Sequence, residues 1–150
     1  MHAVFIAVQA NADPLILRAT GQTVFFDAPL QQGHGFGQQT LPLGGHELVR
    51  RAQKEGLPIT ADVGIHHLHL TDMDIGFFDS NARFTPPLRA QRDREALAAG
   101  AADGTLAICS DHTPIDEDGK ALPFGEAAAG ATGLELLLPL TLQWANAAKL

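Results

Sequence analysis

The sequence is short of cysteine, of basic residues and of long apolar runs, and each shortage narrows the class of protein. Cys109 is the only cysteine, so no disulfide can form within the chain. Its place in an apolar stretch favours a small buried side chain in a reducing compartment. No apolar run reaches the roughly 18 residues that cross a bilayer, and Met1–Ile6 lacks the basic start of a signal peptide. We therefore expect a cytoplasmic protein that does not enter a membrane.

Charge and size narrow the class further. Lysine and arginine number 10 against 17 aspartates and glutamates, which gives a net charge of −7. This sign argues against nucleic acid or an anionic membrane surface as the main partner. The 150 residues, 45% of them hydrophobic, suffice for one domain with a buried core.

The first 45 residues differ in character from the rest. Ala3–Val8 and Thr23–Phe26 each predict a short strand from their β-branched and aromatic content. Gln31–Gln39 is rich in glycine and glutamine and predicts a loop. His34 lies in that loop, where a lone histidine is more often solvated than bound to a metal. We expect a boundary at Gly44–Gly45, with 1–45 unassigned and 46–150 forming the recognisable unit.

From Gly45 onward the pattern alternates between helix and strand. Leu48, Val49 and Ala52 fall at helical spacing before a stop at Gly56, and Ile59–Ile65 predicts a buried strand. We further expect a capped helix start at 71–74, a helix at 88–102 and a loop at 110–130. A last helix starts at 132–135, where the spacing is that of a capping box, or nearer Pro139, because proline interrupts a helix interior.

The polar residues with potential chemistry follow two apolar segments. Leu106–Cys109 predicts a strand, and Asp111 and His112 come directly after it. The carboxyl end of a strand is where α/β enzymes present catalytic groups, although an aspartate that caps a turn beside an exposed histidine explains the same residues equally well. His66, His67 and His69 follow the other strand, and by themselves they are only a histidine cluster.

Several blocks of the sequence resemble one known family, the dihydroorotases, over about His46–Lys149. One matching block, Ile59–Leu68, resembles a strand ending in a histidine pair. The others are Pro86–Arg89, Ser110–Pro114, Asp116–Lys120, Leu122–Gly125 and Gly130–Glu135. Dihydroorotases are cyclic amidohydrolases built on a metal-dependent (β/α)8 barrel, and such a barrel needs about 250 residues. The resemblance therefore implies an α/β fold made of the C-terminal strands and helices of a partial TIM barrel.

The resemblance also implies site residues and a cofactor. By resemblance, His66 and Asp111 are metal-binding residues, and Asp111 is also the carboxylate that acts as the catalytic proton carrier. The backbone of Phe124 and Gly125 resembles the family's contact with the pyrimidine ring. His67 and His69 have no role by resemblance. The implied reaction is the zinc-dependent conversion of dihydroorotate and water to N-carbamoyl-aspartate in pyrimidine biosynthesis.

Departures from the family pattern open other possibilities. Thr85 replaces an asparagine that contacts substrate, and Ile115 replaces a histidine that binds the substrate carboxylate. Loss of that charged hydrogen bond costs roughly 1.5–3 kcal/mol. No family block is found in residues 1–45, so we expect the chain by itself to be incomplete and inactive. A non-catalytic, dihydroorotase-like scaffold for aspartate transcarbamoylase is the alternative, and a truncated product without a role of its own is the third.

Overall fold

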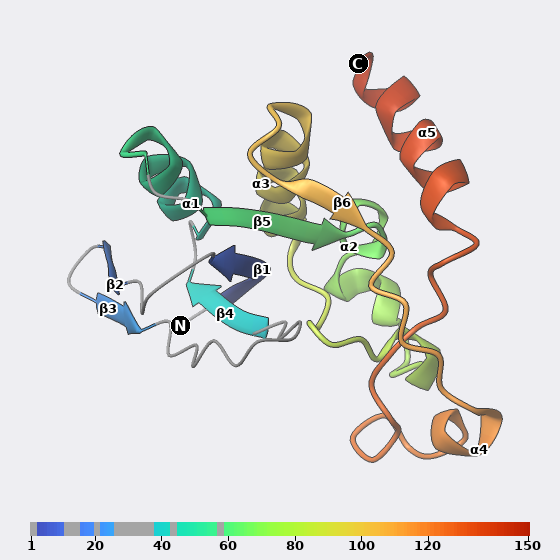
Figure 1. Ribbon diagram of the computed structural model, residues 1–150. Helices are drawn as coiled ribbons and strands as arrows, with labels where there is room; N and C mark the ends of the chain where they lie inside the picture. The colour runs from blue at the N-terminus through green and yellow to red at the C-terminus, as the bar shows by residue number, and fades with distance from the viewer. Residues whose placement is uncertain (1–2, 11–15, 20–21, 26–37, 43–44, 57–58) are drawn as a thin grey trace.

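The computed structural model describes residues 3–10, 16–19, 22–25, 38–42, 45–56 and 59–150, which Figure 1 draws in colour. His34 and most of the predicted loop at 31–39 lie outside the described residues, and so does Gly44 of the predicted boundary. Within the described part, no helix is both long and apolar enough to cross a membrane.

A four-stranded sheet organises the described residues, in the order β4-β1-β5-β6 (Figure 1). Its strands are β1 (Ala3–Ala10), β4 (Gln38–Pro42), β5 (Ile59–Gly64) and β6 (Ala107–Cys109). β1 is antiparallel to both β4 and β5, whereas β5 and β6 are parallel. A separate antiparallel pair joins β2 (Ile16–Ala19) to β3 (Gln22–Phe25). The strands predicted at 3–8, 59–65 and 106–109 are therefore present.

Helices pack beside β5 and supply the core. The helix α1 (Gly45–Lys54) contributes the buried Val49 and Ala52, as its spacing predicts. The helix α3 (Gln91–Ala102) connects β5 to β6 and contributes Leu97. These side chains meet those of β5 and the segments that flank the two parallel strands; the full core set is Val49, Ala52, Ala61, Val63, Ile65, Leu68, Leu97 and Leu106.

Short helical segments fill the connection between β5 and α3. The four-residue α2 (His66–His69) follows β5 directly, and the sequence pattern did not predict it. The turn η1 (Asp72–Ile75) begins at Thr71, whose side chain and backbone form a capping box with Asp74. A second turn, η2 (Ser80–Ala82), follows. The predicted helix start at 71–74 is thus confirmed as a 3-10 turn.

The C-terminal part contains one long helix, α5 (Leu137–Ala148). It begins near Pro139 and not at 132–135, because proline is tolerated only in the first turn of a helix. Leu137, Leu140 and Trp144 pack against the core, so Trp144 is a packing residue as predicted. The segment predicted as a loop at 110–130 contains the short α4 (Glu117–Lys120), whose first turn Asp116 caps through Gly119 at 2.7 Å.

Cys109, predicted to be a small buried side chain, is only half-buried. Leu106 is buried, but Ala107 is exposed and Ile108 and Cys109 are half-buried. The reason is the position of β6, which is the outermost strand of the described sheet and has a neighbour on one side only.

Candidate metal centre

The ends of β5 and β6 bring His66 and Asp111 together. The two strands are parallel and in register at Gly64 and Cys109, and the backbone N–H of Ile65 donates to the Cys109 oxygen at 2.9 Å. Residues that follow the two strands therefore emerge at the same edge of the sheet. His66 Nε2 lies 3.5 Å from Asp111 Oδ2. The sequence prediction that these two side chains lie together agrees with the structure.

His67 adds a third donor that the sequence prediction missed. One donor atom each from His66, His67 and Asp111 lies within 4.8 Å of the others. His66 and His67 are only 8% and 7% exposed, and the Nε2 atom of His66 is buried without a hydrogen-bond partner among the described residues. Buried polar atoms are almost always satisfied, so an unpartnered imidazole nitrogen facing a carboxylate fits a site for a cation.

The orientation of His67 follows from its other ring nitrogen. Nε2 of His67 lies 3.0 Å from the carbonyl oxygen of Pro86. A carbonyl can only accept, so Nε2 carries the proton and Nδ1 keeps its lone pair, and a backbone carbonyl of this kind commonly orients a metal-binding histidine. Burial, together with the neighbouring His66, lowers the pKa of His67 to about 4. His67 is therefore neutral near pH 7, as a metal ligand must be.

Packing around the three donors is close. A Cβ atom on Gly64 would lie 3.1 Å from Asp111 Cβ, from His66 Cε1 and from His67 Nδ1. The ring of Phe84 stacks on His66 with centroids 4.6 Å apart and an interplanar angle of 20°. Asp111 has a φ of 45°, in the left-handed region that aspartate tolerates better than most residues. We call His66, His67 and Asp111 the donor cluster.

Asp62 of β5 and Cys109 of β6 contact each other through their side chains. The thiol of Cys109 donates to Asp62 Oδ1 at 3.6 Å. Burial raises the pKa of the Asp62 carboxyl, an effect that the Cys109 hydrogen bond opposes and the charge of Asp111 reinforces. Burial and the Asp62 carboxylate raise the pKa of Cys109 to about 12. Cys109 is therefore a thiol near pH 7 in the metal-free chain, and its sulfur is not one of the donor atoms grouped with His66, His67 and Asp111.

His69 and His112 are not part of the donor cluster and form hydrogen bonds elsewhere. His69 Nε2 lies 3.0 Å from the Leu140 oxygen on α5. His112 Nδ1 accepts the backbone N–H groups of Gly133 and Leu134, at 3.1 and 3.2 Å. Both rings are therefore engaged with the C-terminal segment.

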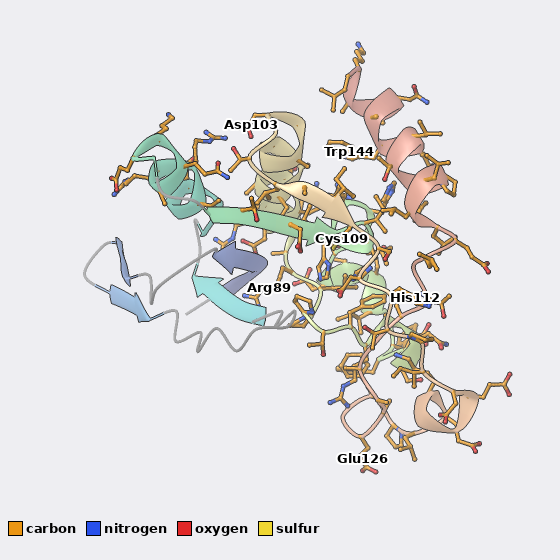
Figure 2. All side chains as sticks on the ribbon, in the orientation of Figure 1. Arg89, Asp103, Cys109, His112, Glu126 and Trp144 are labelled. Atoms are coloured by element: carbon orange, nitrogen blue, oxygen red, sulfur yellow. The ribbon has the colours of Figure 1, made fainter. Side chains whose placement is uncertain are left out.

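Phe124 and Gly125 lie further along the chain than Asp111, between α4 and α5. The Phe124 ring meets the Phe78 ring edge-on at 5.9 Å, and the Phe124 oxygen accepts from Arg83 Nη1 at 2.5 Å. Gly125 has open space where a Cβ atom would stand. Figure 2 shows the adjacent Glu126 well separated from Cys109, which precedes the donor cluster. Among the described residues, the ring and hydrogen-bond contacts of Phe124 are with Phe78 and Arg83 and not with the donor cluster, so the role of Phe124 and Gly125 in substrate binding stays a prediction.

Solved structures with a similar fold define the class of the protein. The chain superposes on D-hydantoinase with a TM-score of 0.62 and 28% identity, over 72% of this chain and 25% of the other. It also superposes on dihydroorotase from Saccharomyces cerevisiae, in complex with 5-fluoroorotic acid, with a TM-score of 0.64 and 21% identity, over 71% of this chain and 30% of the other. The predicted fold class is confirmed: the chain is an α/β segment of a TIM-barrel amidohydrolase.

Relatives in sequence identify the family within that class. Dihydroorotase from Caldanaerobacter subterraneus is 47% identical over 93 residues, 61% of this chain and 22% of the relative. Dihydroorotase from Geobacter sp. is 37% identical over 135 residues, 89% of this chain and 31% of the relative. A dihydroorotase-like protein of Pseudomonas aeruginosa is 46% identical over 99 residues, 65% of this chain and 23% of the relative. The chain is thus a relative of the dihydroorotases, and the predicted resemblance is confirmed.

The extent of these matches defines what the chain contains. It spans between a fifth and a third of the curated relatives named above, with shares of 22%, 31% and 23%. No family model matches it. The barrel-like part is the parallel pair β5 and β6 with its helices, because β1 runs antiparallel to β5 and all eight strands of such a barrel are parallel. The Geobacter alignment covers 89% of the chain and so reaches into residues 1–45. The division at residue 45 stays a prediction.

Proposed function

We propose that this chain is a segment of a zinc-dependent cyclic amide hydrolase of the dihydroorotase type, which acts in the cytoplasm on dihydroorotate and water to give N-carbamoyl-aspartate. The observation that carries the proposal is the unpartnered, buried Nε2 of His66, 3.5 Å from a carboxylate oxygen of Asp111. The dihydroorotases that align with the chain support the choice of reaction.

The donor cluster fits zinc by its chemistry. Two imidazoles and a carboxylate are the ligand set of several catalytic zinc sites, which leave a further position open. His66 and His67 are buried, and His67 is held in the right tautomer by the Pro86 carbonyl. Zinc bound there would supply Lewis acidity and lower the pKa of a water towards 7.

The protein's own residues account for proton movement and for orientation. One oxygen of Asp111 faces His66, and the other is proposed to accept a proton from the attacking water and to pass it to the leaving amide nitrogen. Phe84 covers one face of His66 and keeps water from that side. Phe124 and Gly125, which lie in the same long connection between β6 and α5 as Asp111, are proposed to contact the substrate ring.

One observation favours the alternative, a non-catalytic scaffold for aspartate transcarbamoylase. Ile115 stands where the family has a histidine for the substrate carboxylate. A Cβ atom built on Gly119 would lie 2.8 Å from Ile115 Cγ2, and one built on Gly130 would lie 3.0 Å from Ile115 Cγ1. Ile115 therefore packs inside its own loop, and the position serves loop packing in place of recognition of an anion.

Metal content and turnover separate the two functions. We would purify the chain, measure its zinc content by mass spectrometry and assay dihydroorotate hydrolysis, with Asp111→Ala as the test variant and Asp118→Ala, an exposed acidic residue of the same loop, as the control. Stoichiometric zinc and turnover, both lost only in Asp111→Ala, support the enzyme. A protein without zinc that co-purifies with aspartate transcarbamoylase supports the scaffold.

A further inference from the structure

The loop after β6 is held by a second segment, residues 130–134, which we call the clasp. The backbone N–H of Thr113 donates to the Ala131 oxygen at 2.9 Å. The backbone N–H groups of Gly133 and Leu134 both donate to Nδ1 of His112, at 3.1 and 3.2 Å. Three hydrogen bonds therefore tie residues 112–113 to the clasp.

The two segments also approach each other at the level of the backbone. A Cβ atom on Gly133 would overlap the carbonyl oxygen of Ser110, and one on Gly130 would lie 2.5 Å from the carbonyl oxygen of Thr113. Neither position leaves room for a side chain. The contact therefore depends on glycine at both places, and it flanks Asp111 on its two sides.

Asp111 is the residue between these fixed points. On the β6 side, the Cys109 oxygen accepts from Ile65 N–H at 2.9 Å. On the other side, His112 is tied to the clasp. Asp111 has the left-handed φ of 45°, a conformation that is unfavourable for a residue other than glycine and persists only where its surroundings impose it.

We infer that His112 is a positioning residue: by accepting the two N–H groups of the clasp, its ring fixes the backbone turn that points the Asp111 carboxylate at His66 and His67. This inference rests on the proposed function and adds a residue to it. Because Nδ1 accepts, the ring proton sits on Nε2, and His112 acts through its neighbour, not as a ligand.

The clasp also links α5 to the donor cluster. The backbone N–H of Leu136 donates to the Gly133 oxygen at 3.1 Å, and α5 begins at the next residue. Leu137, Leu140 and Trp144 then pack that helix on the core. The packing of α5 therefore helps to hold the clasp beside His112, together with the hydrogen bond from Gly130 N–H to the Arg83 oxygen at 3.0 Å.

Three variants of His112 test the role of its acceptor. His112→Asn keeps an acceptor oxygen at the same number of bonds from the backbone as Nδ1, whereas His112→Leu puts a methyl group there. His112→Gln moves the acceptor one bond further out and serves as the comparison should the leucine variant not fold. The first readout, on metal-free protein with chelator, is the set of ring nitrogen chemical shifts of His66, with Asp111→Asn as the reference for a lost carboxylate. The second is the affinity and visible absorption of bound Co²⁺.

The expected result is a difference between the asparagine and leucine variants. Loss of a group that orients a ligand typically costs 10–100-fold in metal affinity, so we expect that loss in His112→Leu and His112→Gln, and less than a fewfold change in His112→Asn. The His66 shifts of the leucine variant should move towards those of Asp111→Asn. Unchanged shifts and Co²⁺ affinity in the leucine variant, or equal losses in both variants, would overturn the inference. A wild-type chain that binds no Co²⁺ would contradict the proposed function instead, and the metal-free shifts would still decide the role of His112.

Discussion

A Cβ atom on Gly64 would lie 3.1 Å from the Cβ atom of Asp111, so β5 and the loop after β6 meet so closely that a side chain there would require its neighbours to move by a few tenths of an ångström. The same atom would lie 3.1 Å from His66 Cε1 and from His67 Nδ1. Gly64→Ala should therefore push the donor cluster apart, and we expect Co²⁺ affinity to fall by roughly 10-fold or more, as for other changes that misplace ligands. Isothermal titration calorimetry with Co²⁺ measures this affinity in the wild type and in the variant.

The matched control for this change is Gly125→Ala. A Cβ atom there meets nothing within 4 Å, so metal affinity and stability should stay as in the wild type. Equal effects of the two alanines would show that the space at Gly64 is not what shapes the donor cluster.

The two nitrogens of His67 can be separated by substitution. His67→Gln places an amide near the position of Nε2 and can keep the bond to the Pro86 oxygen, but it removes the Nδ1 donor. His67→Asn does the reverse. We expect the glutamine variant to lose Co²⁺ binding and to unfold at a similar urea concentration, and the asparagine variant to keep part of the binding and to lose about 1 kcal/mol of stability, the usual value of one hydrogen bond. Metal binding that survives in the glutamine variant would remove His67 from the ligand set.

Acid should destabilise the metal-free chain through His67. Its pKa is lowered from 6.5 to about 4 in the folded protein, so between these values the unfolded chain binds a proton that the folded chain does not. Stability is then full above about pH 6.5 and falls as the pH drops to about 4, by roughly 3 kcal/mol over the whole interval. Below about pH 4 this contribution levels off.

Urea unfolding in chelator at several pH values between 4 and 7.5 measures this loss. Since other groups titrate in the same range, the difference between the wild type and His67→Gln isolates the part that belongs to His67. A difference that stays constant with pH would contradict the prediction.

The sequence predicted the part of the site that depends on strand order and missed the part that depends on local turns. His66 and Asp111 could be placed together because parallel strands end at the same edge of a sheet, and each residue follows such an end. His67 could not, because its direction is set by the helical turn of α2 and by a carbonyl 19 residues away, at Pro86. A strand that continued through His67 would have turned it to the opposite face from His66.

Other differences have equally local causes. Pro139 allowed two starts for the last helix, and the structure has the later one. The half-burial of Cys109 follows from the outer position of β6, which no pattern within the strand itself reveals. The roles of Gly130 and Gly133 depend on contacts with Thr113 and Ser110, about 20 residues earlier in the chain, and composition could not indicate them.

The core is expected to depend on Leu97 of α3, which is 3% exposed and belongs to the main apolar cluster. Leu97→Ala removes buried methyl groups and leaves a cavity, so the free energy of unfolding should fall by about 2–4 kcal/mol. The control is Leu138→Ala on α5, because Leu138 is 68% exposed and its loss should change stability by less than about 0.5 kcal/mol. Equal losses from the two changes would mean that α5 is buried in solution by something outside the described residues.

Cys109 should resist alkylation while the chain is folded. Only the thiolate reacts, and burial beside the Asp62 carboxylate raises the pKa of this thiol to about 12. At pH 8 the thiolate fraction is then on the order of one in 10,000, against roughly a quarter for a free cysteine. Iodoacetamide should therefore modify the native chain at least 100-fold more slowly than the chain in urea, as followed by mass spectrometry.

The variant Asp62→Asn tests the cause of this slow reaction. It removes the negative charge beside the sulfur but leaves the strand pairing in place, so it should speed the native reaction severalfold. A native rate close to the rate in urea, with the wild type still folded, would show that the contact between Cys109 and Asp62 does not hold in solution.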